Sequence, residues 1–174
     1  LPASPPMTTA PVITGALTRL RPHVMTDMEA FEAFYQSDRA QFVTKPANRT
    51  HLWYGFAAEV GSWTLTDMGS WAIDVDGQLA GQVSVTHPPH FPETELGWIL
   101  FEDFEGRSIA FAAATLALTY TRETIRPASL VSYIDARNSR SIALAKRLGA
   151  TLDPNADTWD DADVVYRHKV GMAA

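Results

Sequence analysis

The sequence predicts one domain of the α+β (mixed α/β) class, in which helices flank a central, mostly antiparallel sheet. Three observations support this prediction. Apolar residues alternate with polar or small ones on both sides of Asp76-Gly77, which indicates a hairpin with a tight turn. An alanine-rich segment at residues 107–123 has the composition of a long helix. With 174 residues, 46% of them hydrophobic, the chain is long enough to bury one core.

The domain is expected at residues 15–174, after a disordered or tag-like tail at residues 1–14. The absence of cysteine excludes a disulfide framework, a thiolate metal site and a cysteine nucleophile. No apolar run approaches the roughly 20 residues of a membrane span. The N-terminus lacks the basic start and apolar block of a signal peptide. We therefore expect a cytoplasmic protein without a membrane segment.

A short strand and two helices are expected to follow the tail. The strand is predicted at Ala16–Leu20. Thr26 or Asp27 is a suitable N-cap for a helix that reaches about Gln36, because apolar residues recur in this segment at helical spacing. A second helix is predicted from about residue 50 to about residue 61, where its end is poorly marked.

The next segment changes to the period of two that is typical of strands. Strands are predicted at residues 71–75 and 79–85, joined by Asp76-Gly77, and a third at Glu93–Leu100. Successive side chains of a strand point to opposite faces. One face of this third strand is therefore expected to hold Thr94, Leu96, Trp98 and Leu100, and the other Glu95, Gly97 and Ile99.

In the last third of the chain, the residue pattern predicts a helix, a strand, a second helix and a second strand. The alanine-rich helix is followed by a buried-type strand at Leu130–Ile134. Asn138 is a good N-cap for a further helix, and Gly149 suits the position after its C-terminus. A final strand is predicted at Val164–His168.

Charge is distributed unevenly along the chain. The net charge of −6 disfavours a general nucleic-acid binder. Nevertheless, Gly106–Arg147 carries seven basic and two acidic residues, whereas Asp153–Asp163 carries five aspartates and no basic residue. Both runs have a simple interpretation as solvated faces. The alternative is a bipolar molecule that binds an anion near the first run and a cation near the second.

Two helix starts have the chemistry of a binding site. The turn Glu102–Ser108 leads into the alanine-rich helix, whose first N–H groups are unpaired and carry a partial positive charge. Gly106 and the small residues near it would let a diphosphate approach this backbone. The second start, Asn138–Ser141, has a purely structural interpretation as a helix cap, and the residues alone favour that interpretation.

Taken together, these segments resemble the GNAT superfamily of acyltransferases, over nearly the whole chain from Leu17 onward. Glu93–Leu100 is similar to the family's E-x-x-x-G-[YW] strand. Glu105–Ala110 resembles its pyrophosphate loop, [QR]-x-x-G-x-[GA], and Asn138–Ser141 resembles its N-x-x-[SA] helix start. The combination resembles most the RimJ/RimL-like branch, the ribosomal-protein-alanine N-acetyltransferases.

The resemblance implies a sheet with a splayed strand pair that forms a coenzyme A cleft. It also implies transfer of an acetyl group from acetyl-CoA to a primary amine, expected to be a protein or peptide N-terminal α-amine, by direct attack in a ternary complex. The strand edge is expected to contact the pantetheine arm, the turn to hold the diphosphate through backbone amides, and the second helix start to contribute polar groups. These expected cofactor-binding residues are Trp98, Ile99, Leu100, Gly106, Arg107, Ser108, Ile109, Ala110, Asn138 and Ser141.

Two residues are candidates for catalysis within this resemblance. Glu95 lies on the strand that lines the reaction centre and is the candidate base for the attacking amine. Ser141 is the candidate proton donor to the leaving thiolate. Their structural alternatives are an exposed strand carboxylate and a serine in the first turn of a helix.

The sequence departs from the family pattern at three positions. Glu105 stands where Gln or Arg is preferred, and Ser108 where Gly is preferred. We expect Ser108 to fill that position if its φ angle is negative. Many members carry a tyrosine acid where this chain has Ala145, so that acid is missing here.

Several alternatives remain open at this point. The acceptor is either a peptide N-terminus or a small amine such as an amino acid, a polyamine or an antibiotic. A non-catalytic CoA-binding regulatory domain is a second class, and a different, all-parallel nucleotide fold is disfavoured by the hairpin. His87 and His90 flank two prolines without a third metal ligand nearby, so no metal site is expected. A homodimer also remains open.

Overall fold

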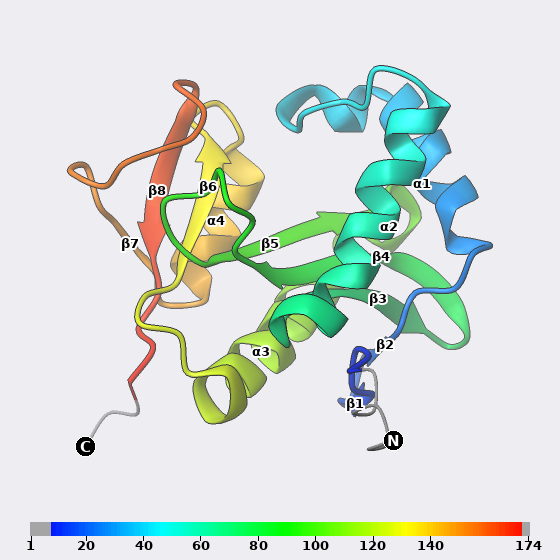
Figure 1. Cartoon of the computed structure of the whole chain (residues 1–174), viewed down its shortest axis with the longest axis horizontal. Coiled ribbons are helices and arrows are strands. Elements are labelled where there is room, and N and C mark those ends of the chain that lie inside the picture. The colour runs from blue at the N-terminus through cyan, green and yellow to red at the C-terminus, as the bar shows by residue number, and fades with distance from the viewer. Residues whose placement is uncertain (1–7, 172–174) are drawn as a thin grey trace, which may run out of the picture.

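One eight-stranded sheet runs through the computed structural model, which describes residues 8–171 (Figure 1). Its strand order is β1-β2-β3-β4-β5-β6-β8-β7, and the one parallel pair in this order is β5 with β6. The strands are β1 (Ile13–Thr14), β2 (Arg19–Arg21), β3 (Gly69–Val75), β4 (Gln78–Thr86), β5 (Glu95–Leu100), β6 (Val131–Asp135), β7 (Thr151–Leu152) and β8 (Asp163–Arg167). The predicted mixed α/β fold with a mostly antiparallel sheet is confirmed.

Helices cover both faces of this sheet. The α-helices are α1 (Asp27–Gln36), α2 (Arg49–Thr66), α3 (Ile109–Tyr120) and α4 (Ser139–Arg147). Short helical turns lie at η1 (Asp38–Phe42), η2 (Glu102–Phe104) and η3 (Thr121–Ile125), the last with π-helical hydrogen bonding. No helix within residues 8–171 is long and apolar enough to span a bilayer.

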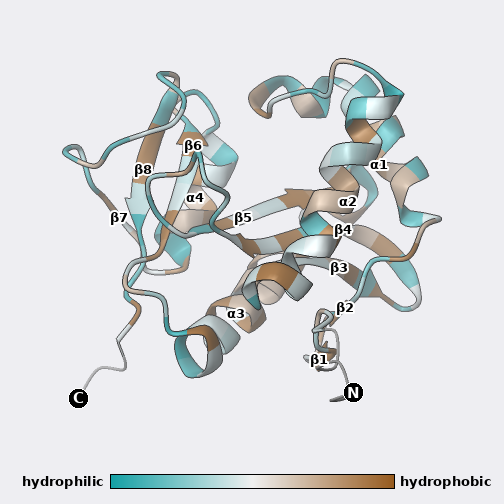
Figure 2. Ribbon diagram, viewed as in Figure 1, coloured by the Kyte–Doolittle hydropathy of each residue, from teal (hydrophilic) through white to brown (hydrophobic). Residues whose placement is uncertain are grey.

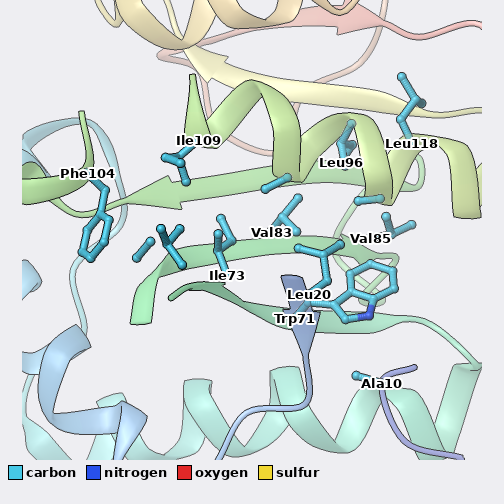
Figure 3. Packing of buried hydrophobic residues seen from close by; sticks show 14 of the residues in the cluster. Ala10, Leu20, Trp71, Ile73, Val83, Val85, Leu96, Phe104, Ile109 and Leu118 are labelled. Atoms are coloured by element: carbon cyan, nitrogen blue, oxygen red, sulfur yellow. The ribbon is translucent and has the colours of Figure 1, made fainter. Parts of the chain in front are cut away.

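Alternate side chains of β5 point into the two helical layers on opposite faces of the sheet. Leu96 packs with Ile109 and Ala113 of α3 in the main core, and Figure 3 shows Leu96 and Ile109 between α3 and the strands. Ile99 packs on the opposite face, with residues of α1 and α2. The hydropathy colours in Figure 2 show apolar residues along the central strands and α3. The predicted division of this strand between two faces is therefore confirmed.

The Asp76-Gly77 turn connects β3 and β4 as expected. Both residues have positive φ angles, 52° and 81°, which a primed two-residue turn requires. The Gly77 N–H also donates to Asp74 Oδ1 at 3.1 Å, which tightens the turn. The hairpin therefore lies within the antiparallel part of the sheet, between β2 and β5.

The structure corrects several element boundaries. Residues 8–14, which the sequence placed in a tail, include β1, and Ala10 is buried in the main core. The first seven residues of that expected tail lie outside the described part of the chain. Helix α2 continues five residues beyond Gly61 to Thr66, where Asp67 adopts the left-handed conformation and ends it. The short strand β7 was missed because two exposed residues carry no periodicity.

Candidate active site

A wedge opens between β5 and β6. The two parallel strands form one bridge, Glu95 with Val131, and the Val131 N–H donates to the Thr94 carbonyl at 2.9 Å. Beyond this bridge the described residues of the two strands form no further pairs. The two strand edges are therefore free to hydrogen-bond a ligand from Gly97 onward, and the predicted splayed strand pair is present.

Ser132 lies at the apex of the wedge, where the next ladder bond would form. Its hydroxyl donates to the Leu96 carbonyl at 2.5 Å, and its oxygen lies 2.9 Å from Nε2 of the buried His168. Because the serine proton is used on Leu96, His168 must donate from Nε2. The Ser132 hydroxyl thus donates to the Leu96 carbonyl, which would accept a hydrogen bond from a backbone N–H of β6 if the parallel ladder continued. A side chain therefore closes the apex and leaves the strands free to diverge.

Glu95 is partly buried beside this apex, on the α1–α2 face of the sheet. A Cβ placed on Gly97 would lie 3.6 Å from Oε2 of Glu95, so the carboxyl group leans along β5 over the glycine. Burial, followed by the negative charge of Glu59, raises the pKa of Glu95 to about 8, although a hydrogen bond from the Tyr133 backbone opposes the rise. The group is therefore able to accept or release a proton near neutral pH.

Two acidic residues near Glu95 were not singled out from the sequence. Burial raises the pKa of Glu59, on α2, to about 7, and Gln82 of β4 donates to its Oε2 at 3.3 Å. Asp163, at the start of β8, has a pKa raised to about 6 by burial and by Asp160 and Asp135. Asp163 belongs to the acidic run that the sequence associated with a cation. Glu59 had no such signal, because only the tertiary fold brings it to the sheet.

The start of α3 is open. Gly106 and Ser108 are exposed, with φ angles of 68° and 59°, and the Ser108 side chain forms no capping hydrogen bond. The condition set for Ser108, a negative φ, is therefore not met. Its left-handed conformation, which non-glycine residues seldom adopt, turns the chain sharply into the helix. The first N–H groups of α3 are therefore not capped by the residue that precedes them.

Arginines from separate elements surround this helix start. Arg39 of η1 and Arg140 of α4 both pair with Glu105, the latter at 2.7 Å. Arg147 lies 3.8 Å from the centre of the Phe111 ring and donates to Ser108 Oγ at 3.4 Å. Two positive charges thus offset the carboxylate of Glu105, the residue that departs from the family pattern. The surroundings of the turn remain cationic.

The predicted residues of α4 meet β5 across the wedge. Asn138 caps the helix, since its side chain accepts from the Ser141 N–H at 3.2 Å. The Trp98 indole N–H donates to Ser141 Oγ, also at 3.2 Å. Because this hydroxyl accepts from the indole, its own proton points elsewhere. Trp98 and Ser141, expected from separate motifs, are therefore in direct contact.

The other predicted cofactor-binding residues differ in which groups they leave available to a ligand. Ile109 is buried in the main core, so its backbone N–H is the group it can offer to a ligand. The Leu100 carbonyl accepts from Arg39 at 3.3 Å. Arg107 and Ala110 lie in the same turn, exposed and partly buried respectively. Ala145, at the position where the family resemblance implies a tyrosine acid, is buried against Ile134 and cannot act as an acid.

The histidine loop is built into an aromatic cluster. His87 lies 3.2 Å from the Phe91 carbonyl, and His90 packs edge-on against Phe91 and Trp159. Within residues 8–171 no group of three or more potential ligands could hold a metal ion. The loop therefore packs β4–β5 against the segment before β8.

The site fits a coenzyme with a diphosphate and a linear amide-containing arm. The uncapped N–H groups of α3 and the exposed glycine before them suit a diphosphate, which helix starts bind through backbone donors and their partial positive charge. The wedge offers free strand edges to an amide-containing arm.

Comparison with known proteins supports the same interpretation. The family described as "Acetyltransferase (GNAT) domain" matches residues 18–151. A crystal structure of an acetyltransferase from Agrobacterium tumefaciens str. C58 is 36% identical and superposes with a TM-score of 0.87, over 96% of this chain and 99% of that one. A protein from T. thermophilus described as a "putative acetyltransferase" is 28% identical, with a TM-score of 0.70 over 91% and 89% of the two chains.

The fold is also shared with more distant structures. RimL, described as a ribosomal L7/L12 alpha-N-protein acetyltransferase, has a TM-score of 0.73 at 18% identity, over 97% of this chain and 98% of that one. A second RimL structure contains coenzyme A and matches with the same identity and TM-score. At this identity the likeness establishes a common fold.

Proposed function

The chain belongs to the GNAT acetyltransferase family, and we propose that the amine it acetylates is the α-amine of a protein or peptide N-terminus. It is an N-acetyltransferase that uses acetyl-CoA as the acetyl donor. The observation that carries the proposal about the acceptor is the position of Glu95. It lies beside the apex of the wedge, on the face of β5 that packs against α1 and α2.

The proton affinity of Glu95 suits an α-amine. An amine attacks only when neutral, so its proton must be removed. The pKa of a protein α-amine, about 7.7–8.0, is close to the value of about 8 at Glu95. A lysine or polyamine nitrogen, near 10.4, would lose its proton to the same carboxylate with an added cost of about 3 kcal/mol. RimL, which shares the fold, is described as acting on an α-amine.

In the proposed mechanism, Glu95 accepts the proton from the amine while Glu59 and Asp163 favour its approach as a cation. Acetyl-CoA, when bound, supplies the thioester carbonyl that the amine attacks. The backbone N–H groups of the Gly106–Ala110 turn would bind the diphosphate, and the free edge of β5 at Trp98–Leu100 would orient the arm. Asn138 holds the start of α4, which carries the proton donor.

Ser141 is the proposed donor to the leaving sulfur. The indole of Trp98 occupies the acceptor side of the hydroxyl at 3.2 Å, so the hydroxyl proton is directed to another partner. Because a thiol has a pKa near 8.5, its thiolate needs only a modest hydrogen bond to leave. We therefore expect Ser141 to contribute less to the rate than Glu95.

The proposal is tested with purified protein, acetyl-CoA and three matched acceptors. These are a peptide with a free N-terminus, the same peptide blocked at its N-terminus but carrying lysine, and a set of polyamines and amino acids. Thiol release gives the rate, and fragmentation by mass spectrometry locates the acetyl group. We expect the free α-amine to react fastest. Turnover restricted to small amines would contradict the proposal.

A further inference from the structure

We infer that the first residue of the acceptor carries an apolar side chain, which binds in a pocket between α1 and α2. This inference rests on the proposed function, because it assigns a substrate class to the same reaction centre. It depends on a cavity whose shape and chemistry are independent of the coenzyme half of the site.

The pocket has the size of one amino-acid side chain with its backbone. Its volume is about 240 Å³, which corresponds to about eight water molecules at roughly 30 Å³ each. Sites for drug-sized ligands are larger, from about 300 Å³ upward. Phe31, Tyr35, Leu52, Phe56, Glu59 and Gln82 line it, and so do the exposed Thr44, Lys45 and His51.

The floor of the pocket lies next to the candidate base. Gln82 pairs with Ile99 across β4 and β5, and the adjacent pair on the same face is Ser84 with Gly97. The carboxyl group of Glu95 leans over Gly97, in the direction of Ile99 and its partner Gln82. One step between same-face pairs is about 7 Å. Because a side chain begins on the carbon bonded to the α-amine, an amine at Glu95 brings that side chain to the pocket.

The buried part of the wall, at Phe31 and Leu52, is apolar, whereas the charge of Lys45 lies on an exposed residue of the lining. Phe31 and Phe56 pack against each other with ring centroids 6.2 Å apart and planes tilted by 50°, and Leu52 is buried in the same cluster. A charged side chain would lose its hydration against these groups, whereas an apolar one would be removed from water. Glu59 is the acid on the floor, and Gln82 already donates to it. The pocket therefore matches leucine, methionine or phenylalanine better than serine, aspartate or lysine.

Acetylation of a peptide series that differs only at its first residue tests this inference. We expect kcat/KM for leucine, methionine and phenylalanine to exceed that for serine and aspartate by about 10–200-fold, the range that a hydrophobic pocket achieves. Equal rates across the series would overturn the inference while leaving α-amine acetylation in place. Activity on small amines alone would instead overturn the proposed function on which the inference rests.

Two glycines of α2 provide matched variants. Gly55 lines the pocket, and a Cβ added there meets nothing within 4 Å, so Gly55→Leu places a side chain at the pocket without disturbing the core. Gly61 is also free of neighbours within 4 Å of such a Cβ but does not line the pocket, so Gly61→Leu is the control.

We expect Gly55→Leu to lower kcat/KM for the leucine peptide at least tenfold and to reduce its preference over the serine peptide, while the affinity for coenzyme A is unchanged. Gly61→Leu should retain both rates. Thermal unfolding of both variants shows whether they are folded. A folded Gly55→Leu protein with the wild-type preference would overturn the inference.

Discussion

The two halves of the active site are built from different parts of the polypeptide. At the start of α3, the groups proposed to bind the diphosphate are backbone N–H donors of consecutive residues, Gly106–Ala110. On the opposite face of the sheet, Glu95, Glu59 and Gln82 come from β5, α2 and β4. The coenzyme half therefore depends on local backbone conformation, whereas the acceptor half depends on tertiary packing. This difference predicts that mutations can separate cofactor affinity from acyl transfer.

Glu95→Gln should separate the two halves most clearly. The variant keeps the shape of the side chain but cannot accept a proton, so kcat should fall by about 10²–10⁴-fold. The dissociation constant for coenzyme A, measured by calorimetry, should stay near the wild-type value. In the wild type, kcat/KM should rise with pH through about 8, because Glu95 becomes ionised there. The same pH profile in the variant would show that Glu95 is not the base.

A stability measurement controls for misfolding of this variant. The pKa of Glu95 is higher in the folded protein than its ordinary value of 4.5. Ionisation is therefore less favourable in the folded state, and the wild type loses stability as pH rises from about 4.5 through about 8. Glu95→Gln lacks this loss. At pH 8 its midpoint of thermal unfolding should equal or exceed that of the wild type.

Ser132→Ala tests whether the apex of the wedge connects the two halves. The change leaves the buried Leu96 carbonyl and His168 Nε2 without the serine partner, which should destabilise the fold by about 1–3 kcal/mol per group. Because the hydroxyl also sets where β5 and β6 diverge, we expect a several-fold weaker affinity for coenzyme A. Calorimetry and denaturant unfolding measure the two effects.

Ser70→Ala is the matched control for the apex. Ser70 is a buried strand serine whose hydroxyl has no hydrogen-bond partner within residues 8–171. Its removal should cost little stability and should not change cofactor affinity. If Ser132→Ala lost stability but bound coenzyme A like the wild type, the serine would support the fold without shaping the wedge.

Glu59→Gln should change the pH dependence of acyl transfer without changing the affinity for coenzyme A. The charge of Glu59 raises the pKa of Glu95 more than that of Asp163 does. Removing it should move the rise of kcat/KM to lower pH, and Asp163→Asn should move it in the same direction by less. Initial rates between pH 6 and 9 measure both shifts. An unchanged profile in Glu59→Gln would mean that the two glutamates do not interact in the working enzyme.

The local elements of the fold were largely predictable because they depend on residues that are close in sequence. The Asp76-Gly77 turn, the two-faced strand β5 and the cap at Asn138 each depend on neighbouring residues, and the structure contains all three. The contact between Trp98 and Ser141 joins two predicted residues, although no sequence pattern indicated their hydrogen bond. Short-range rules therefore identify the elements and their ends better than their mutual contacts.

Of the proposed acceptor half, the sequence singled out Glu95 but not Glu59 or Gln82, because tertiary packing brings these residues together. Glu59 lies on a helix whose end near Gly61 was misjudged, because a glycine inside a helix resembles a stop signal. Gln82 is one polar residue in an alternating strand, and its role follows from the pairing with Ile99. The Ser132–His168 contact at the apex joins positions 36 residues apart. A single sequence contains no record of such contacts.

Ser108→Gly should produce the smallest effect, and it tests the claim that backbone groups bind the diphosphate. Ser108 has a φ of 59°, which costs a non-glycine residue roughly 1–2 kcal/mol. Glycine removes this strain but adds freedom to the unfolded chain, so stability should change by less than about 1 kcal/mol. Affinity for coenzyme A, measured by calorimetry, should hold or increase slightly. A large loss of affinity would show instead that the hydroxyl, which accepts from Arg147 at 3.4 Å, belongs to the binding site.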